Sequence, residues 1–224
     1  MGGDHLSLRG ILFDLDGTLL DSERVDIMCM TRLFHHDLGL KLSQDEIAGY
    51  RSLPSRQVLE QFAPDRVEEL LTTWTAYQAQ VLGQTQLFSG ILETLQSLSG
   101  AGLVLGVVTG QNRAELEKTR RHIGLDGLID VWVSADDAAF AKPHPAPVRL
   151  ALDALGCPPH QAIMVGDSRF DMAAGREAGT QLGAAAWGVR DLAPLLEYHP
   201  DYIFQQPQQM MTLLQGNDHK GDAP

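Results

Sequence analysis

The apolar residues of this chain fall into short continuous runs that are separated by amphipathic segments. Runs without polar–apolar alternation are typical of strands that are buried on both faces of a sheet. They predict strands at residues 9–14, 103–110, 129–134, 162–167 and 182–188. Helical spacing predicts helices at residues 90–102, 113–125, 145–156 and 169–179. This alternation of strands and helices predicts an α/β fold, in which a parallel sheet is flanked by helices.

One long segment interrupts this alternation directly after the first strand. Residues 22–85 show helical spacing and contain no strand candidate. We therefore expect residues 1–21 and 86–216 to form one α/β core, and residues 22–85 to form an all-helical insertion. The polar, turn-rich residues 217–224 are expected to form a frayed tail.

The composition narrows the class of protein without identifying a function. The chain has 224 residues, a formal net charge of −12 and two cysteines. This acidic balance disfavours nucleic-acid binding, and two cysteines provide no disulfide framework. We expect a cytoplasmic protein without a membrane segment, because the chain shows no signal-peptide pattern and no apolar run approaching about 18 residues. The sequence leaves the oligomeric state open between a monomer and a homodimer.

Two aspartates follow the first strand, in the stretch "FDLDGT". Asp14 and Asp16 are two residues apart, so an extended backbone turns both side chains toward roughly the same side. Two neighbouring carboxylates are costly to bury unless a positive group lies between them. An isolated pair of this kind is typical of a turn, so its meaning depends on the ends of the other strands.

The other strands also end in polar residues: Thr109 and Gly110 after the second, Lys142 in the loop after the third, and Asp167, Ser168 and Asp171 after the fourth. A turn or a helix N-cap would explain each feature alone. The carboxyl ends of parallel strands, however, lie at one edge of the sheet, where ligands bind. Four such features in this order indicate a site for a metal ion and a phosphate group.

The chemistry of such a site gives each side chain a role. The Asp14 carboxylate can attack phosphorus and form an aspartyl-phosphate, while Asp16 protonates the leaving oxygen and later takes a proton from water. Mg²⁺ prefers oxygen ligands, so Asp167 would complete a magnesium shell with the first two aspartates. Ser168 and Asp171 would support the magnesium ligands without binding the ion themselves. The threonine and the lysine of the other strand ends would hold the phosphoryl oxygens.

Four ordered motifs carry a resemblance to a known family: "DLDGTLLDS", "VVTG", "AKPHPAP" and "VGDSRFDMAAGREAG". They resemble the motifs of the haloacid dehalogenase-like hydrolase superfamily, over the chain up to about Trp187. The insertion is similar to the helical cap of the branch that contains phosphoglycolate phosphatase and β-phosphoglucomutase. The resemblance implies a Rossmann-like core and a helical cap that closes over the site.

The resemblance also implies roles for individual residues. Asp14 would be the nucleophile and a metal ligand, and Asp16 the acid and base, with its backbone carbonyl on the metal. Thr109 and Lys142 would bind phosphate, and Asp167 would bind Mg²⁺.

Three features separate this chain from parts of that superfamily. Gly110 follows Thr109 where the family pattern has Asn or a similar polar residue, so we expect the phosphate to depend more on backbone donors, among them that of Gly110. Asp16 is replaced in true dehalogenases of the superfamily, so its presence argues against carbon–halogen cleavage. Lys41 lies in an expected loop of the insertion, which argues against the Schiff-base lysine of the phosphonate-cleaving branch.

The insertion should select the substrate, because the core motifs contact only the phosphate. The segment "GYRSLPSRQVLEQF" is broken by glycine and proline and offers Tyr50, Arg51 and Arg56. These three residues are candidates for contact with a substrate. The alternative is that both arginines are solvated charges at helix ends.

The sequence therefore predicts a Mg²⁺-dependent phosphatase that acts on a small phosphorylated metabolite, either phosphoglycolate-like or a sugar phosphate. Two alternatives use the same core residues: a β-phosphoglucomutase-like phosphosugar mutase and a pyrophosphatase. A non-catalytic relative is disfavoured because the costly group of Asp14, Asp16, Lys142 and Asp167 is intact.

Overall fold

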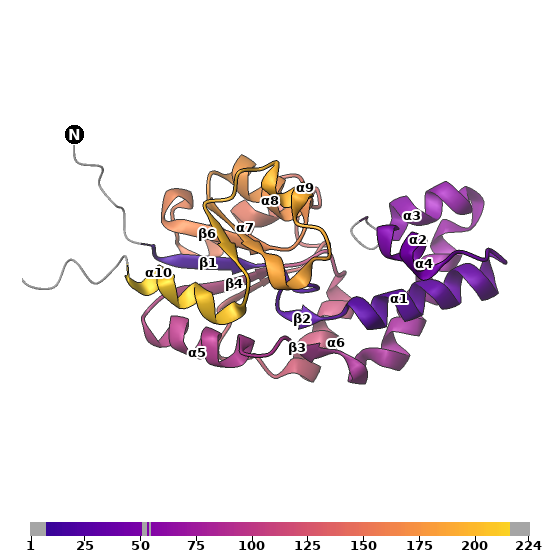
Figure 1. The fold of residues 1–224 in the computed structure, drawn as a ribbon, viewed down its shortest axis with the longest axis horizontal. Coiled ribbons are helices and arrows are strands. Elements are labelled where there is room, and N and C mark those ends of the chain that lie inside the picture. The colour runs from indigo at the N-terminus through magenta and orange to yellow at the C-terminus, as the bar shows by residue number, and fades with distance from the viewer. Residues whose placement is uncertain (1–7, 51–52, 54, 216–224) are drawn as a thin grey trace, which may run out of the picture. The chain divides into compact units, whose positions relative to one another are not determined.

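The structure is a computed structural model that describes residues 8–50, 53 and 55–215. The described residues form two compact units (Figure 1). One unit is built from the chain up to Leu20 and from Leu87 onward, and the other is Asp21–Gln86. The expected tail at residues 217–224 lies outside the described residues.

A parallel sheet forms the centre of the first unit, with the strand order β5-β4-β1-β6-β7-β8. Figure 1 labels three of its neighbouring strands, β4, β1 and β6. The strands are β1 Gly10–Phe13, β4 Val104–Val108, β5 Val131–Val133, β6 Ala162–Gly166, β7 Gln181–Ala185 and β8 Tyr202–Phe204. Phe13 of β1 lies in register with Val107 of β4 and Val165 of β6. The chain builds outward from β1 to β5 and then returns to add β6 on the other side, so the order of the strands reverses beside β1.

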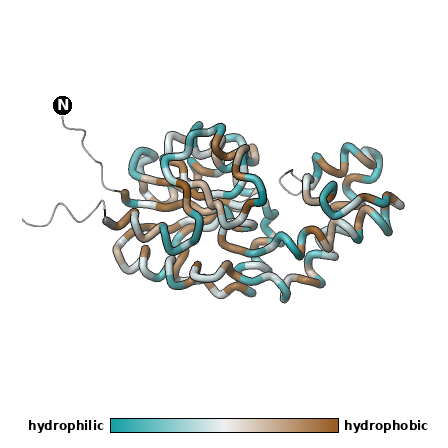
Figure 2. Tube along the Cα trace, in the orientation of Figure 1, coloured by the Kyte–Doolittle hydropathy of each residue, from teal (hydrophilic) through white to brown (hydrophobic). Residues whose placement is uncertain are grey.

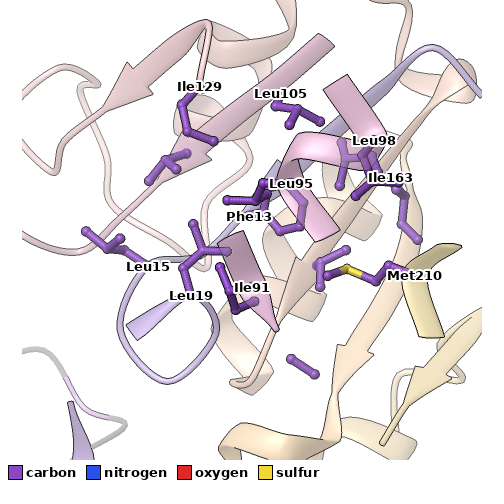
Figure 3. Packing of buried hydrophobic residues seen from close by; sticks show 14 of the residues in the cluster. Phe13, Leu15, Leu19, Ile91, Leu95, Leu98, Leu105, Ile129, Ile163 and Met210 are labelled. Carbon is purple, nitrogen blue, oxygen red and sulfur yellow. The ribbon is translucent and has the colours of Figure 1, made fainter. Parts of the chain in front are cut away.

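Alternate residues of β1 point into two separate layers of the core. Phe13 packs with the layer that contains Ile91 and Leu95 of α5, and Leu12 packs with the layer that contains Val148 of α7. Figure 3 shows Phe13 among the side chains of the first layer. The layers are covered by α5 Ile91–Gly100 and α6 Arg113–Ile123 on one face, and by α7 Ala146–Leu155 and α8 Arg169–Ala178 on the other. Figure 2 shows hydrophobic segments, in brown, along the chain of this unit. The predicted α/β fold with a parallel sheet flanked by helices is confirmed.

The second unit is helical and has its own core. Its helices are α1 Glu23–Arg32, α2 Gln44–Tyr50, α3 Ser55–Phe62 and α4 Val67–Val81, with a π-helical turn at Leu33–Asp37. Phe34 lies at the centre of this core, 5.0 Å from the Phe62 ring and 5.9 Å from the Tyr50 ring, measured between centroids. A two-stranded sheet of β2 Leu20–Asp21 and β3 Gln86–Leu87 holds the two ends of the insertion together.

The segment 182–204 differs from the sequence prediction in two places. The strand expected at 182–188 stops at Ala185, and Ala186–Gly188 form a 3₁₀ turn. Tyr202–Phe204 form an additional edge strand, which the surrounding turn residues obscured in the sequence. The remaining short helices are α9 Ala193–Leu196, α10 Thr212–Gln215 and the 3₁₀ turns Pro64–Arg66, Leu82–Gln84, Pro159–Gln161 and Pro207–Met211.

Candidate active site

The ends of the central strands place three polar residues at one edge of the sheet. Asp14 follows β1, and its backbone N–H donates to the carbonyl of Val165 over 2.9 Å. Thr109 follows β4 and is held in the same way by the carbonyl of Val133 at 3.0 Å. Asp167 follows β6. Hydrogen bonds of the sheet therefore fix the backbone of Asp14 and Thr109.

Lys142 joins two buried carboxylates in this region. Its ammonium group lies 2.5 Å from Asp14 Oδ1 and 2.6 Å from Asp171 Oδ1, and it also donates to the backbone carbonyl of Val108 over 2.8 Å. An ammonium group has three donors, so these contacts use its full capacity. Only 9% of the lysine side chain and 1% of the Asp171 side chain are exposed to solvent.

The buried group of Lys142, Asp14 and Asp171 contains one basic and two acidic side chains. Burial raises the pKa of Asp14 to about 7 from an ordinary value of 3.8, an effect that the ion pair with Lys142 opposes and that Asp171 and Asp16 increase. Burial alone would lower the pKa of Lys142, but attraction to Asp14 and Asp171 outweighs it and keeps that pKa above its ordinary range. The lysine is therefore held charged, while Asp14 has too little positive charge around it.

The oxygen atoms of this region suit a hard cation. Asp14, Asp167 and Asp171 each offer a carboxylate oxygen, and these oxygens lie within 4.8 Å of one another. An all-oxygen donor set with excess negative charge is the kind of site that binds Mg²⁺. The residues present therefore fit the expected ion.

Asp171 is held by its own helix end as well as by Lys142. Its Oδ2 accepts from the Ser168 hydroxyl at 2.5 Å and from the Ser168 backbone N–H at 3.0 Å, in a capping box that begins α8. A Cβ atom on Gly166 would lie 2.3 Å from the Cβ of Asp171, so only glycine fits there. Both oxygens of Asp171 are thus engaged by protein donors. A supporting role of Ser168 and Asp171 at a metal site stays a prediction.

Asp16 has a partner that the sequence analysis did not identify. Its Oδ2 accepts a hydrogen bond of 2.7 Å from the side-chain amide of Gln111. Gln111 directly follows Gly110, the residue at which the second motif departs from the family pattern. The available signal was its position two residues after Thr109, which brings a long amide side chain to the same edge of the sheet.

Thr18 is a second residue that the sequence analysis did not assign. Its hydroxyl donates to Asp167 Oδ1 over 3.1 Å, and its backbone carbonyl accepts from the indole N–H of Trp187 at 2.9 Å. The 3₁₀ turn after β7 makes this second contact possible. At Gly17 the backbone has φ +83°, and a Cβ atom there would lie 2.2 Å from Asp167 Oδ2. The turn after Asp16 thus requires glycine and packs directly against the carboxylate of Asp167.

The two residues predicted to bind phosphate through the second motif have different surroundings. Thr109 is 3% exposed, and its Oγ1 accepts from the backbone N–H of Gln111 at 3.1 Å. Gly110 is exposed, and a Cβ atom there would meet nothing within 4 Å. Open space therefore adjoins the backbone at Gly110. Phosphate binding by these residues stays a prediction.

The expected substrate-contacting residues have partners inside the helical unit. The ring of Tyr50 lies 5.4 Å from the Phe62 ring. Arg56 forms an ion pair of 2.7 Å with Glu68 between exposed side chains. Arg51 lies outside the described residues. A role of Tyr50, Arg51 and Arg56 in substrate choice stays a prediction.

The sequence and the fold both match known proteins over most of the chain. The sequence pattern of the family "Haloacid dehalogenase-like hydrolase" matches residues 11–185. "Pyrophosphatase PpaX" of Bacillus velezensis is 31% identical over 207 residues, covering 92% of this chain and 96% of the relative. The protein of the same name from Anoxybacillus flavithermus is 29% identical over 93% of this chain and 98% of the relative. A Lactobacillus plantarum protein, provisionally named phosphoglycolate phosphatase, has a solved structure with a TM-score of 0.86, at 27% identity over 93% of this chain and all of that one.

The parallel sheet flanked by helices, with an acidic cluster at its carboxyl edge, is typical of phosphatases with a Rossmann-like α/β fold. The chain belongs to the haloacid dehalogenase-like hydrolase family. The family resemblance expected from the four motifs is confirmed, as is the prediction of an enzyme of the phosphatase type. Among the helices in the described part of the chain, none is both long and apolar enough to cross a membrane.

Proposed function

We propose that this protein is a Mg²⁺-dependent phosphatase that hydrolyses a small phosphorylated metabolite through an aspartyl-phosphate on Asp14. The observation that supports this most directly is the contact of Lys142 with both Asp14 and Asp171, beside the carboxylate of Asp167. One lysine cannot neutralise this acidic group and a phosphate dianion together. A divalent cation supplies the missing positive charge.

The metal ligands would be the carboxylates of Asp14 and Asp167 and the backbone carbonyl of Asp16. Bound there, Mg²⁺ would offset the repulsion between the phosphate and the attacking carboxylate. Asp171 would act through Lys142 and Ser168 rather than as a ligand, because both of its oxygens accept protein hydrogen bonds.

The reaction then proceeds in two displacements at phosphorus. An oxygen of Asp14 attacks phosphorus, the bond from phosphorus to the leaving oxygen breaks, and Asp16 gives its proton to that oxygen. In the second displacement, Asp16 takes a proton from water, the water oxygen attacks phosphorus, and the bond to Asp14 breaks. Thr109 and the backbone at Gly110 hold the phosphoryl oxygens as charge develops on them, and Lys142 joins them by turning one of its three donors from a protein acceptor to the phosphoryl group.

The helical insertion and the names of some relatives support the proposed substrate class. Phosphoglycolate-like compounds and sugar phosphates fit a phosphatase with a cap, and the name of the Lactobacillus plantarum structure points the same way. The pyrophosphatase alternative has weaker support, which comes from the names of the two relatives described above. We place the activity in the cytoplasm and expect neither nucleic acid nor a membrane as partner.

The test is phosphate release from phosphoglycolate, hexose 1- and 6-phosphates, nucleotides and pyrophosphate, with Mg²⁺ and with EDTA. Strong release that needs Mg²⁺ and is abolished in Asp14→Asn supports the proposal and identifies the substrate class. Asp153→Asn, at an exposed position of α7, is the matched control and should keep wild-type rates. Turnover that survives in Asp14→Asn or in EDTA contradicts the proposal. Conversion of β-glucose 1-phosphate to the 6-phosphate without phosphate release would establish the mutase instead.

A further inference from the structure

The side chain of Gln111 connects Asp16 to helix α6. Its amide nitrogen donates to Asp16 Oδ2 over 2.7 Å, and its amide oxygen accepts from the Thr119 hydroxyl at 3.0 Å. Thr119 lies within α6 and is 3% exposed. The orientation of the amide follows from chemistry, because a carboxylate can only accept and must face the NH₂ group.

The backbone of Gln111 is fixed at two further points. Its N–H donates to Thr109 Oγ1 over 3.1 Å, and its carbonyl accepts from the N–H of Ala135 at 2.8 Å. The next residue, Asn112, is the N-cap of α6 and forms a capping box with Glu115. Gln111 is therefore held by strand end, loop and helix, so its long side chain is restricted to one direction.

We propose that Gln111 is a positioning residue that sets the rotation of the Asp16 carboxyl group for proton transfer to the leaving oxygen. This inference depends on the proposed function, in which Asp16 is the acid. A carboxyl group whose Oδ2 accepts from an amide N–H carries its proton on Oδ1. Gln111 thus determines which oxygen gives the proton, and Thr119 holds Gln111 in place.

A positioning role for an acid has a specific kinetic signature. A basic leaving oxygen needs the proton, whereas a stabilised leaving group departs without much help. Phenyl phosphate and p-nitrophenyl phosphate differ in this respect while presenting similar rings to the protein. Loss of a correctly oriented acid therefore slows phenyl phosphate hydrolysis selectively, which a general structural defect would not do.

The test compares kcat/KM for these two esters in Gln111→Leu, Thr119→Val and Thr119→Ser. Because general acid catalysis contributes about 10²–10⁴-fold, we expect Gln111→Leu to lower kcat/KM about tenfold or more for phenyl phosphate. For p-nitrophenyl phosphate, which depends less on the acid, we expect a loss of no more than about threefold. Thr119→Val should show the same selectivity with a smaller loss. Thr119→Ser keeps the hydroxyl and should behave as wild type.

Each outcome separates the positioning role from the proposed function. Equal losses on both esters in Gln111→Leu, or no loss on either, overturn the positioning role alone. A wild-type protein that releases no phosphate with Mg²⁺, from either ester or from the metabolite panel, overturns the proposed function and the positioning role with it. Melting temperatures of all variants, measured alongside, establish that each one is folded under the assay conditions.

Discussion

Lys142 donates to Asp14 over 2.5 Å, although the two residues are 128 positions apart in the sequence. The lysine comes from the loop between β5 and α7, and the aspartate from the end of β1. The same ammonium group contacts Asp171, so one cation holds two carboxylates that would otherwise repel each other. This arrangement links the stability of the sheet edge to the chemistry proposed for it.

Replacement of Lys142 by Met is expected to damage both stability and activity. The change keeps most of the side-chain volume but leaves buried carboxylates without their partner, which costs about 3 kcal/mol or more. Urea unfolding should show this loss, and phosphate release should fall to background. Lys118→Met, at an exposed position of α6, is the control and should change the free energy of unfolding by no more than about 0.5 kcal/mol. Unchanged unfolding in Lys142→Met would contradict the structural role of the ion pairs.

The metal-free protein should become less stable as the pH rises toward neutrality. The pKa of Asp14 is raised by burial from 3.8 to about 7, so the folded chain binds this proton more tightly than the unfolded chain does. The stabilisation is complete below pH 3.8 and is lost as the pH rises through about 7. In EDTA, the free energy of unfolding should therefore fall between pH 5 and 8 by more in the wild type than in Asp14→Asn.

The same experiment with Mg²⁺ provides the internal control for that prediction. A bound cation compensates the charge of Asp14, so Mg²⁺ should stabilise the wild type more at pH 8 than at pH 5. Identical slopes for the wild type and Asp14→Asn in EDTA would show that Asp14 is not the group responsible.

Thr18→Val is expected to weaken magnesium binding without changing the metal ligands. The variant removes the hydroxyl that donates to Asp167 Oδ1. Loss of such a supporting hydrogen bond costs about 10–100-fold in metal affinity. The Mg²⁺ concentration for half-maximal activity should rise accordingly, while Thr18→Ser should stay near the wild type. An unchanged magnesium dependence in Thr18→Val would show that this hydroxyl does not orient Asp167.

Much of the fold could be predicted because continuous apolar runs and amphipathic helices leave clear patterns. The order of those runs also predicted that Asp14, Lys142 and Asp167 meet at one edge of the sheet. The edge strand β8 was missed because three residues between turn signals carry no periodicity.

The contacts between individual side chains could not be predicted from the sequence. The hydrogen bond between Gln111 and Asp16 spans 95 positions, and that between Trp187 and Thr18 spans 169. No local pattern encodes which of several polar residues at a strand edge becomes the partner of another. The packing of Tyr50 against Phe62 likewise depends on how α2 and α3 meet, which spacing along the chain does not determine.

The most direct measurement of the central claim is chemical trapping of the phosphorylated residue. Wild-type protein turning over p-nitrophenyl phosphate with Mg²⁺ would be quenched in acid, reduced with borohydride and analysed by peptide mass spectrometry. An aspartyl-phosphate is reduced to homoserine, so the proposed mechanism predicts homoserine at position 14 only when both substrate and Mg²⁺ are present. An unmodified Asp14 in protein that is turning over, or homoserine at another aspartate, would contradict the account.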